Sequence, residues 1–322
     1  MTRVAVLALI LLAAASASVK GQPASKAVRI DVVLFSTPAT EPNLAAFVAG
    51  LRDLGYVDGR NISLEYRNAE GHPDRFRDLA LRTAALNPDV IVVLGGDMVP
   101  FIKSATSTIP VVMLTSYDPV EAGIINSFAR PGGNLTGVAF VSSETGAKRL
   151  QLLKEAVPAL TRIAVLWSPD HPDGEYRDIE SAARRLGVHV ESLEVRRPED
   201  FDAAFQVATR ARAEALMVVS SRLMNLNRTR ILEFANRQRV PLVSGWGPWA
   251  TAGGFMSYGP DLNALAKRAA THVDKIVKGA KPSDLAVEQP TKFELVVNLR
   301  TAKLLGLTIP PSVLVRADQI IE

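Results

Sequence analysis

From residue 28 onward the chain alternates between two hydrophobic patterns, and this alternation predicts its fold class. Short apolar runs rich in β-branched residues, such as 28–35 and 90–94, are typical of buried strands. Between such runs, as in 42–54, apolar residues recur at spacings of three and four, which predicts a helix with one buried face. Strands that alternate with helices favour parallel sheets with right-handed crossovers, so we predict an α/β protein.

The predicted elements form two series with the same order. The predicted strands are 28–35, 61–66, 90–94, 111–114, 163–167, 188–195, 215–219, 241–244, 255–258 and 293–298. The predicted helices are 42–54, 74–86, 95–106, 174–186, 199–212, 225–237, 261–278 and one through Ala302 and Leu305 to Gly306. Two such series predict two doubly wound lobes, with binding loops at the carboxyl ends of the strands. The elements after 255 are more than the second lobe needs, so we expect the chain to cross between the lobes more than once and form a hinge.

The N-terminus has the three parts of a secretory signal peptide. Arg3 supplies a positive charge, residues 4–15 form an unbroken apolar run, and Ala15-Ser16-Ala17 provides small residues for cleavage. Twelve helical residues rise only about 18 Å, too short for a hydrocarbon core of about 30 Å. We expect a signal peptide over 1–17, with cleavage possible up to 22, and a periplasmic protein with no membrane insertion after cleavage.

Charge and cysteine content exclude several classes of partner and chemistry. The 322 residues carry a net charge of +4, which falls to +3 without Arg3. That field is too weak to predict a nucleic-acid partner, whose affinity grows with the number of phosphates neutralised. The sequence has no cysteine, which rules out disulfides, thiolate metal sites, cysteine nucleophiles and a lipid-anchored cysteine.

Several longer motifs are similar to those of a known family. The sequence resembles a family of ABC-transporter substrate-binding proteins whose best understood members bind tryptophan, tyrosine or phenylalanine, and the similarity runs in order from 28 to 322. The matching motifs are Asp118-Pro119-Val120, Ala129-Arg130-Pro131-Gly132-Gly133-Asn134-Leu135-Thr136-Gly137, and the segments 54–61, 254–261 and 289–298.

The resemblance implies a fold and a function. It implies the type I periplasmic-binding fold, with two Rossmann-like lobes and three crossings near 136–140, 256–259 and 292–296. The implied N-terminal lobe is 28–138 plus 257–290, and the implied C-terminal lobe is 139–256 plus 291–322. The implied function is capture of a small ligand, which we expect to be an aromatic amino acid or aromatic carboxylate. Its implied partners are an ABC permease and its ATPase, and we expect a monomer.

Candidate ligand-binding residues of the first lobe follow its strands. Gly95, Gly96 and Asp97 stand between a strand and a helix, where free backbone N–H groups favour a carboxylate. A tight turn with Asp97 as N-cap explains the same residues. Ser36 and Thr37 end the first strand, and their hydroxyls could bind a ligand carboxylate or cap the next helix.

Ser116, Tyr117 and Asp118 follow the fourth strand. Asp118 could pair with a ligand ammonium, but an Asp before Pro at a helix start is also a good cap, and we favour the cap. We expect Tyr117 to be more exposed to the cleft than Asp118, and its ring could stack there on a ring of the ligand.

Candidates in the second lobe include two of the three tryptophans. Trp167, Ser220, Ser221 and Trp246 stand at strand ends that face the inferred cleft. An exposed indole favours a flat ligand clamped between the lobes, whereas interlobe or core packing is the alternative for both tryptophans. At the crossings, Phe140 and Tyr258 could line the back wall of the cleft or pack the hinge.

Nothing in the sequence supports catalysis. The four histidines lack the H-E-x-x-H spacing and no G-x-S-x-G is present, so we expect no enzyme, no cofactor and no metal. The first hypothesis is a solute-binding component of an ABC importer. The alternatives are a periplasmic ligand-sensing module for a membrane receptor and a divergent exported hydrolase.

Overall fold

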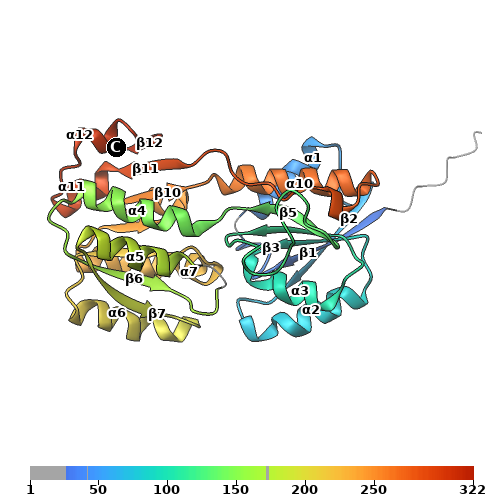
Figure 1. The fold of residues 1–322 in the computed structure, drawn as a ribbon, viewed down its shortest axis with the longest axis horizontal. Helices are drawn as coiled ribbons and strands as arrows, with labels where there is room; N and C mark the ends of the chain where they lie inside the picture. Colours follow the sequence, from blue (N-terminus) through green and yellow to red (C-terminus); the bar gives the residue numbers. More distant parts are fainter. Residues whose placement is uncertain (1–26, 42, 172–173) are drawn as a thin grey trace, which may run out of the picture.

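The computed structural model describes residues 27–41, 43–171 and 174–322. The predicted signal peptide, including any cleavage up to 22, lies outside the described residues. Two α/β lobes lie side by side along the long axis of the molecule and are joined along one side (Figure 1). The predicted fold class, two doubly wound lobes joined by a three-crossing hinge, is confirmed.

The first lobe is built on a five-stranded parallel sheet with the order β2-β1-β3-β4-β5. The strands β3, β4 and β5 are buried along their whole length, as the apolar runs 90–94 and 111–114 predict for β3 and β4. The strands are β1 Val28–Leu34, β2 Ile62–Asn68, β3 Val90–Leu94, β4 Val111–Thr115 and β5 Leu135–Ala139.

Helices cover both faces of this sheet. One face packs against α1 and α10, and the other packs against α2 and α3. Gly50 permits the close approach of α1 to α10, because a Cβ there would lie 3.0 Å from the Cα of Lys267. The helical elements of this lobe are α1 Leu44–Asp53, η1 Pro73–Arg75, α2 Phe76–Ala85, η2 Gly96–Met98, α3 Val99–Ala105, α10 Leu262–Val277 and η4 Pro282–Asp284.

The second lobe is built on a seven-stranded sheet with the order β12-β11-β10-β9-β8-β6-β7. Only the β10–β11 pairing is antiparallel among the pairings of these named strands. The strands are β6 Arg162–Trp167, β7 His189–Glu194, β8 Ala215–Val218, β9 Leu242–Ser244, β10 Met256–Gly259, β11 Glu294–Asn298 and β12 Gln319–Ile321.

The helices of the second lobe also lie on two faces. The helices α4 and α5 pack together over one face, and α6 and α8 cover the other. The single helix predicted over 225–237 is instead two helices that meet at Asn227. The helical elements are α4 Ser142–Ala156, α5 Glu175–Leu186, η3 Pro198–Asp200, α6 Phe201–Arg210, α7 Arg222–Leu226, α8 Arg228–Gln238, α9 Gly247–Thr251, α11 Leu299–Leu305 and α12 Pro311–Leu314.

The chain passes between the lobes after β5, between β10 and α10, and between α10 and β11. The implied lobe boundaries at 138/139 and 256/257 fall inside β5 and β10. Each of these strands pairs wholly within one sheet, β5 in the first lobe and β10 in the second. Because Gly137 stands in the middle of β5, the strand signal there is weak. A Cβ at Gly137 would collide with the backbone of Met113 on β4.

The two lobes are in contact across the space between them. One cluster of buried apolar side chains includes Phe35 and Phe76 of the first lobe together with Leu223 and Trp246 of the second. A cluster that continues from one lobe to the other is expected when the lobes are closed, because the facing surfaces then exclude water. The strand ends that carry the predicted binding loops therefore face each other at short range.

Candidate functional site

A cleft lies where the carboxyl ends of the two sheets meet. Seven of the predicted site residues line it, and they come from both lobes and from the first crossing. The lining residues are Asn43, Gly95, Gly96, Asp97, Leu114, Ser116, Phe140, His171, Ser221, Arg222, Trp246 and Leu262. The seven predicted among them are Gly95, Gly96, Asp97, Ser116, Phe140, Ser221 and Trp246.

The turn after β3 brings backbone into the cleft. A Cβ at Gly96 would lie 2.5 Å from Thr115 Oγ1 and 2.8 Å from the Tyr117 ring, so only glycine fits without movement there. Asp97 makes no side-chain cap for η2 or α3. The alternative that Asp97 is a helix N-cap is therefore wrong, and its carboxylate is free to face the second lobe.

A histidine of the second lobe connects to two predicted residues of the first. His171 Nδ1 hydrogen-bonds to Asp97 Oδ1, and His171 Nε2 lies 2.9 Å from Ser116 Oγ. The side chain of His171 is almost fully buried. This contact joins the turn after β3 and the end of β4 to the loop after β6, so it exists only when the lobes are close together.

A buried ion pair makes a second connection between the lobes. Arg222 Nη1 lies 3.1 Å from Glu41 Oε1, and the two side chains are 9% and 0% exposed. The other carboxylate oxygen of Glu41 accepts a hydrogen bond from Ser36 Oγ at 3.0 Å. Burial raises the pKa of Glu41, although the nearby Arg222 charge and the Ser36 bonds act in the opposite direction.

Acidic groups of the first lobe face basic groups of the second lobe across the cleft. The first lobe contributes the carboxylates Glu41 and Asp97, and the second contributes the guanidinium of Arg222 and the imidazole of His171. Opposite charges inside a closed, poorly hydrated site attract more strongly than on the surface. The same groups can bind the ammonium and carboxylate of a zwitterion.

Trp246 supplies a flat apolar wall. Its side chain is 6% exposed, and its Nε1 has no hydrogen-bond partner among the described residues. Phe140 lines the same cleft from the first crossing. Two aromatic rings and one unused N–H donor at a closed cleft are features of a site for a planar, partly polar ligand.

Four predicted residues of the first lobe lie outside the cleft lining. Ser36 is buried and bonded to Glu41, and Thr37 is exposed in a turn with Thr40. The expectation that Tyr117 is exposed to the cleft is wrong. Its side chain is 1% exposed in the core, its hydroxyl donates to the Gly96 carbonyl at 3.2 Å, and burial raises its pKa.

Asp118 acts as a cap, as favoured from the sequence. Its Oδ1 accepts hydrogen bonds from the backbone N–H groups of Val120 at 2.7 Å and Glu121 at 3.1 Å. A carboxylate with two such bonds already has partners, so the arrangement leaves less capacity for a ligand ammonium. We therefore place Asp118 outside the candidate site.

Three predicted residues of the second lobe are also engaged elsewhere. Trp167 stacks on Tyr176 with ring centres 4.2 Å apart, and its Nε1 donates to Ser192 Oγ at 2.8 Å. Tyr258 stacks on Phe293 at the hinge. The Ser220 hydroxyl accepts a hydrogen bond of 3.4 Å from a buried arginine of its own lobe. The contacts of Trp167 match the alternative given for it, which is packing within the protein and not ligand binding.

Sequence reasoning missed Glu41, Asn43, His171 and Arg222. Arg222 directly follows the selected Ser221, and Glu41 lies four residues after the selected Thr37, in the loop that follows the first strand. His171 lies four residues after the end of β6, where a strand-end loop is expected to face the cleft. The position of these residues relative to the strand ends was therefore the sequence signal that could have identified them.

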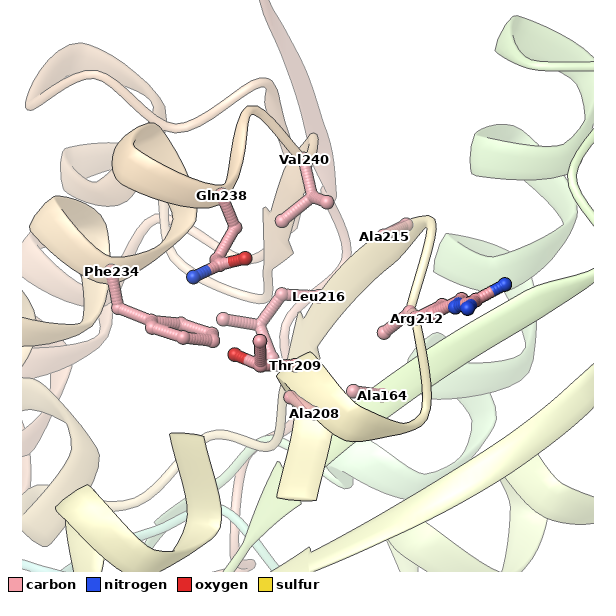
Figure 2. A pocket seen from close by; sticks show the side chains of 10 residues that line it. Ala164, Ala208, Thr209, Arg212, Ala215, Leu216, Phe234, Gln238 and Val240 are labelled. Atoms are coloured by element: carbon pink, nitrogen blue, oxygen red, sulfur yellow. The ribbon is translucent and has the colours of Figure 1, made fainter. Parts of the chain in front are cut away.

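Further cavities differ from the cleft in position and lining. A small pocket lies in the second lobe, between α6, β8 and α8, and its lining contains small and apolar side chains such as Ala208, Leu216 and Phe234 (Figure 2). In that view the guanidinium of Arg212 is directed away from the Phe234 ring and the Gln238 amide. The pocket lies apart from the charged groups that join the two lobes.

Two searches of the described residues were negative. No group of three or more His, Cys, Asp or Glu residues in 27–41, 43–171 and 174–322 is arranged to hold a metal ion. Within the same ranges, no helix combines the length and apolar character needed to cross a bilayer.

Comparison with known proteins identifies the family. The sequence profile of the family described as ABC transporter substrate binding protein matches residues 28–321. The chain belongs to this family. The family predicted from the sequence motifs is therefore confirmed.

Relatives of this substrate-binding protein include proteins with stated ligands. A tyrosine-binding protein from Clostridioides difficile (strain R20291) is 23% identical over 277 residues, which cover 85% of this chain and 79% of the relative. A conserved domain protein from Vibrio cholerae superposes with a TM-score of 0.85 at 25% identity, covering 92% of this chain and all of that one.

A third similar structure contains a bound amino acid. The ABC domain from Streptococcus pneumoniae, crystallised in complex with L-Trp, superposes on this substrate-binding protein with a TM-score of 0.83. It is 25% identical and covers 92% of this chain and 100% of its own. Because the superposition includes both lobes, the relative arrangement of the lobes in the two proteins is similar.

Proposed function

We propose that this substrate-binding protein captures an aromatic amino acid by closing its two lobes and delivers it to an ABC permease driven by an ATPase. The observation that carries the proposal is the cleft itself, where acidic groups of one lobe face basic groups of the other beside Trp246. The tyrosine-binding relative and the relative in complex with L-Trp support the same class of ligand.

The zwitterionic head of the ligand is assigned to the charged residues. Arg222 lines the cleft and presents a guanidinium that suits a carboxylate, while Asp97 presents an oxygen that suits an ammonium. In the closed lobes Arg222 faces the Glu41 carboxylate, and Asp97 hydrogen-bonds to the His171 imidazole. A bound amino acid would therefore replace these contacts with its own carboxylate and ammonium, while Glu41 keeps its hydrogen bonds from Ser36.

The aromatic side chain of the ligand is assigned to the wall formed by Trp246 and Phe140. Stacked or edge-to-face rings contribute about 0.5–1.5 kcal/mol beyond the area that they bury. Ligand contacts with both lobes form only in the closed arrangement. The ligand therefore stabilises the closed population, which is the state that we propose docks on the permease.

We also propose that the protein reaches the periplasm through cleavage of the signal peptide and acts there as a monomer. The export proposal rests on the charged, apolar and small-residue pattern of residues 1–17.

Isothermal titration of the mature protein tests the proposed ligand. We expect L-tryptophan, L-tyrosine or L-phenylalanine to bind, and L-leucine and galactose to bind at least about tenfold more weakly, since Trp246 and Phe140 favour a ring. The matched variants are Asp97→Asn and Asp78→Asn, because Asp78 forms an exposed pair with Arg82 away from the cleft. Binding of galactose or leucine alone, or equal affinity in both variants and the wild type, would contradict the proposal.

A further inference from the structure

The second lobe contains a buried ion pair that is not part of the cleft lining. Arg149 of α4 pairs with Glu175 at the start of α5, and both side chains are 1% exposed. Neither residue lines the cleft. Both nevertheless contact strand-end loops that do, so the pair lies next to the wall that the second lobe contributes to the site.

The loop after β8 is bound by both members of the pair. The Ser220 backbone N–H donates to Glu175 Oε2 at 3.3 Å, and Arg149 Nη1 donates to Ser220 Oγ at 3.4 Å. The next two residues, Ser221 and Arg222, line the cleft. Because the backbone has only two soft dihedral angles per residue, fixing Ser220 at both its backbone and its side chain limits the direction in which Arg222 leaves the sheet.

The loop after β9 contacts the same guanidinium. A Cβ at Gly245 would collide with Arg149 Nη1 and with Ser220 Oγ, so the guanidinium occupies the space that a side chain at 245 would need. Trp246 follows directly and lines the cleft. The position of Arg149 therefore limits how far the loop that carries Trp246 can move toward α4.

The third lining segment of the second lobe precedes Glu175. His171, which also lines the cleft, lies four residues before Glu175 in the sequence. A Cβ at Gly146 would lie 2.8 Å from Glu175 Cγ, so this glycine lets α4 approach the start of α5. The segments that adjoin this one buried pair contain the second-lobe residues of the cleft lining, which are His171, Ser221, Arg222 and Trp246.

Stability alone does not explain a charged pair at this place. Two apolar side chains of similar volume often stabilise a core as well as a buried ion pair does, because the desolvation of two charges offsets their attraction. Hydrogen bonds are directional, whereas apolar contacts are not. A pair whose hydrogen bonds end on Ser220 can therefore set the geometry of a loop, which apolar side chains could not do.

We infer that Arg149 and Glu175 are positioning residues for the ligand site. They hold the loops after β8 and β9 so that Arg222 and Trp246 face the first lobe, and they touch no ligand themselves. The inference rests on the proposed capture of an aromatic amino acid and adds two residues that influence its affinity without contacting it. Because preformed binding groups lose less conformational freedom when a ligand binds, the pair raises affinity through the loops.

A double variant separates positioning from stability. Arg149→Met combined with Glu175→Leu leaves no unpaired buried charge, so it should recover most of the fall in Tm shown by Arg149→Met alone. The Kd of the tightest-binding of L-tryptophan, L-tyrosine and L-phenylalanine should nevertheless stay at least about tenfold above the wild-type value, because Ser220 has lost both partners. Calorimetric titration and thermal unfolding of the same samples measure the two quantities.

The control for the double variant is Ile163→Ala. Ile163 is fully buried near the amino end of β6, away from the strand-end loops, and its truncation leaves a cavity. The control should lower Tm and leave Kd within about twofold of the wild-type value. A double variant that binds with the wild-type Kd would overturn the inference.

Amide hydrogen exchange without added ligand gives a readout that does not depend on the proposed function. In the double variant, exchange should become at least about tenfold faster in 219–224 and 244–248 than in the wild type, and it should stay unchanged in the other strands of the second lobe. A uniform rise across the second lobe would overturn the inference. If none of the three amino acids binds the wild type, the proposed function fails, and the local or uniform pattern of exchange still decides the positioning role.

Two glycines of one loop provide a second test that removes no charge. Neither Gly245 nor Gly247 has a positive φ, so alanine fits the backbone at both. Gly245→Ala places a methyl group against Arg149 and Ser220. A methyl group at Gly247 would have only the Val296 side chain within 4 Å, at 3.8 Å. We expect Gly245→Ala to weaken binding about tenfold and Gly247→Ala to leave Kd within about twofold of the wild-type value. Equal affinity of the two variants would overturn the inference.

Discussion

The second lobe contains two buried arginines that each face a glutamate, and the two pairs differ in where the glutamate lies. Arg149 on α4 pairs with Glu175 on α5, and both side chains are 1% exposed within the second lobe. Arg222 at the start of α7 pairs with Glu41 of the first lobe. The first pair is complete within one lobe, whereas the second depends on the distance between the two lobes.

The surroundings of the Arg149–Glu175 pair are arranged for permanent burial. Arg149 Nη2 lies 3.3 Å from Thr145 Oγ1 and Arg149 Nη1 lies 3.4 Å from Ser220 Oγ, while Glu175 Oε2 accepts the Ser220 backbone N–H at 3.3 Å. A Cβ at Gly245 would collide with the guanidinium and the Ser220 hydroxyl. The absence of that side chain makes room for the pair between α4, α5 and β9.

The Arg222–Glu41 pair has fewer compensating contacts. Arg222 Nη1 and Glu41 Oε1 are close enough to attract each other, yet neither atom has a hydrogen bond among the described residues. When the lobes separate, water can hydrate both groups. The comparison therefore teaches that one pair holds a lobe together and the other is available to respond to a ligand.

The largest expected effect is the loss of stability in Arg149→Met. Removing one partner of a fully buried ion pair leaves an uncompensated charge, which costs about 3–5 kcal/mol. Thermal unfolding of the mature protein should show this as a clear fall in Tm. In the control Arg184→Met, which breaks an exposed pair with Glu180 on α5, the change should stay below about 1 kcal/mol. A loss in Arg149→Met as small as in the control would contradict the structural role of the pair.

The next effect is on affinity and comes from Arg222→Met. The variant removes the proposed carboxylate partner, and a hydrogen bond to a charged group is worth about 1.5–3 kcal/mol, or roughly a 10- to 150-fold change in Kd. Its loss of stability should be smaller than that of Arg149→Met, because opening of the lobes can hydrate Glu41. Titration and thermal unfolding on the same samples measure both quantities. An unchanged Kd together with a large fall in Tm would make the two pairs equivalent and remove the distinction.

The smallest expected effect concerns pH and Glu41. Since burial raises the pKa of Glu41, the folded protein holds this proton to higher pH than the unfolded chain does. The contribution of Glu41 to stability is therefore most favourable below the usual pKa of the group, and it falls as the pH rises through the raised value. Replacement by Gln should remove this component, so the Tm difference between Glu41→Gln and the wild type should grow in favour of the variant from acid to neutral pH. A difference that is constant with pH, or that changes with the opposite sign, would contradict this assignment.

The sequence predicted the positions of the strand ends better than the directions of the side chains. The turn at Gly95-Gly96-Asp97 lines the cleft because it follows a buried parallel strand, and such strand ends carry binding loops. Ser116 and Tyr117 are neighbours after β4, yet Ser116 lines the cleft and Tyr117 packs in the core. Successive residues in extended backbone point in opposite directions, and a register difference of one residue reverses the assignment.

The contacts between the lobes were beyond the reach of a single sequence. Glu41 and Arg222 come from different lobes, and so do Asp97 and His171. No local spacing relates such residues, because their proximity depends on how the three crossings place one lobe against the other. The same limit applies to the tryptophans, since Trp167 and Trp246 both end a strand but only Trp246 lines the cleft.

A crystal structure of the mature protein grown with L-tyrosine tests the central claim most directly. The account predicts the amino acid in the cleft between the lobes, with its carboxylate at Arg222, its ammonium at Asp97 and its ring against Trp246. An amino acid bound outside this cleft, or one held in it with Arg222 still paired to Glu41 and Trp246 free of contact, would contradict the account.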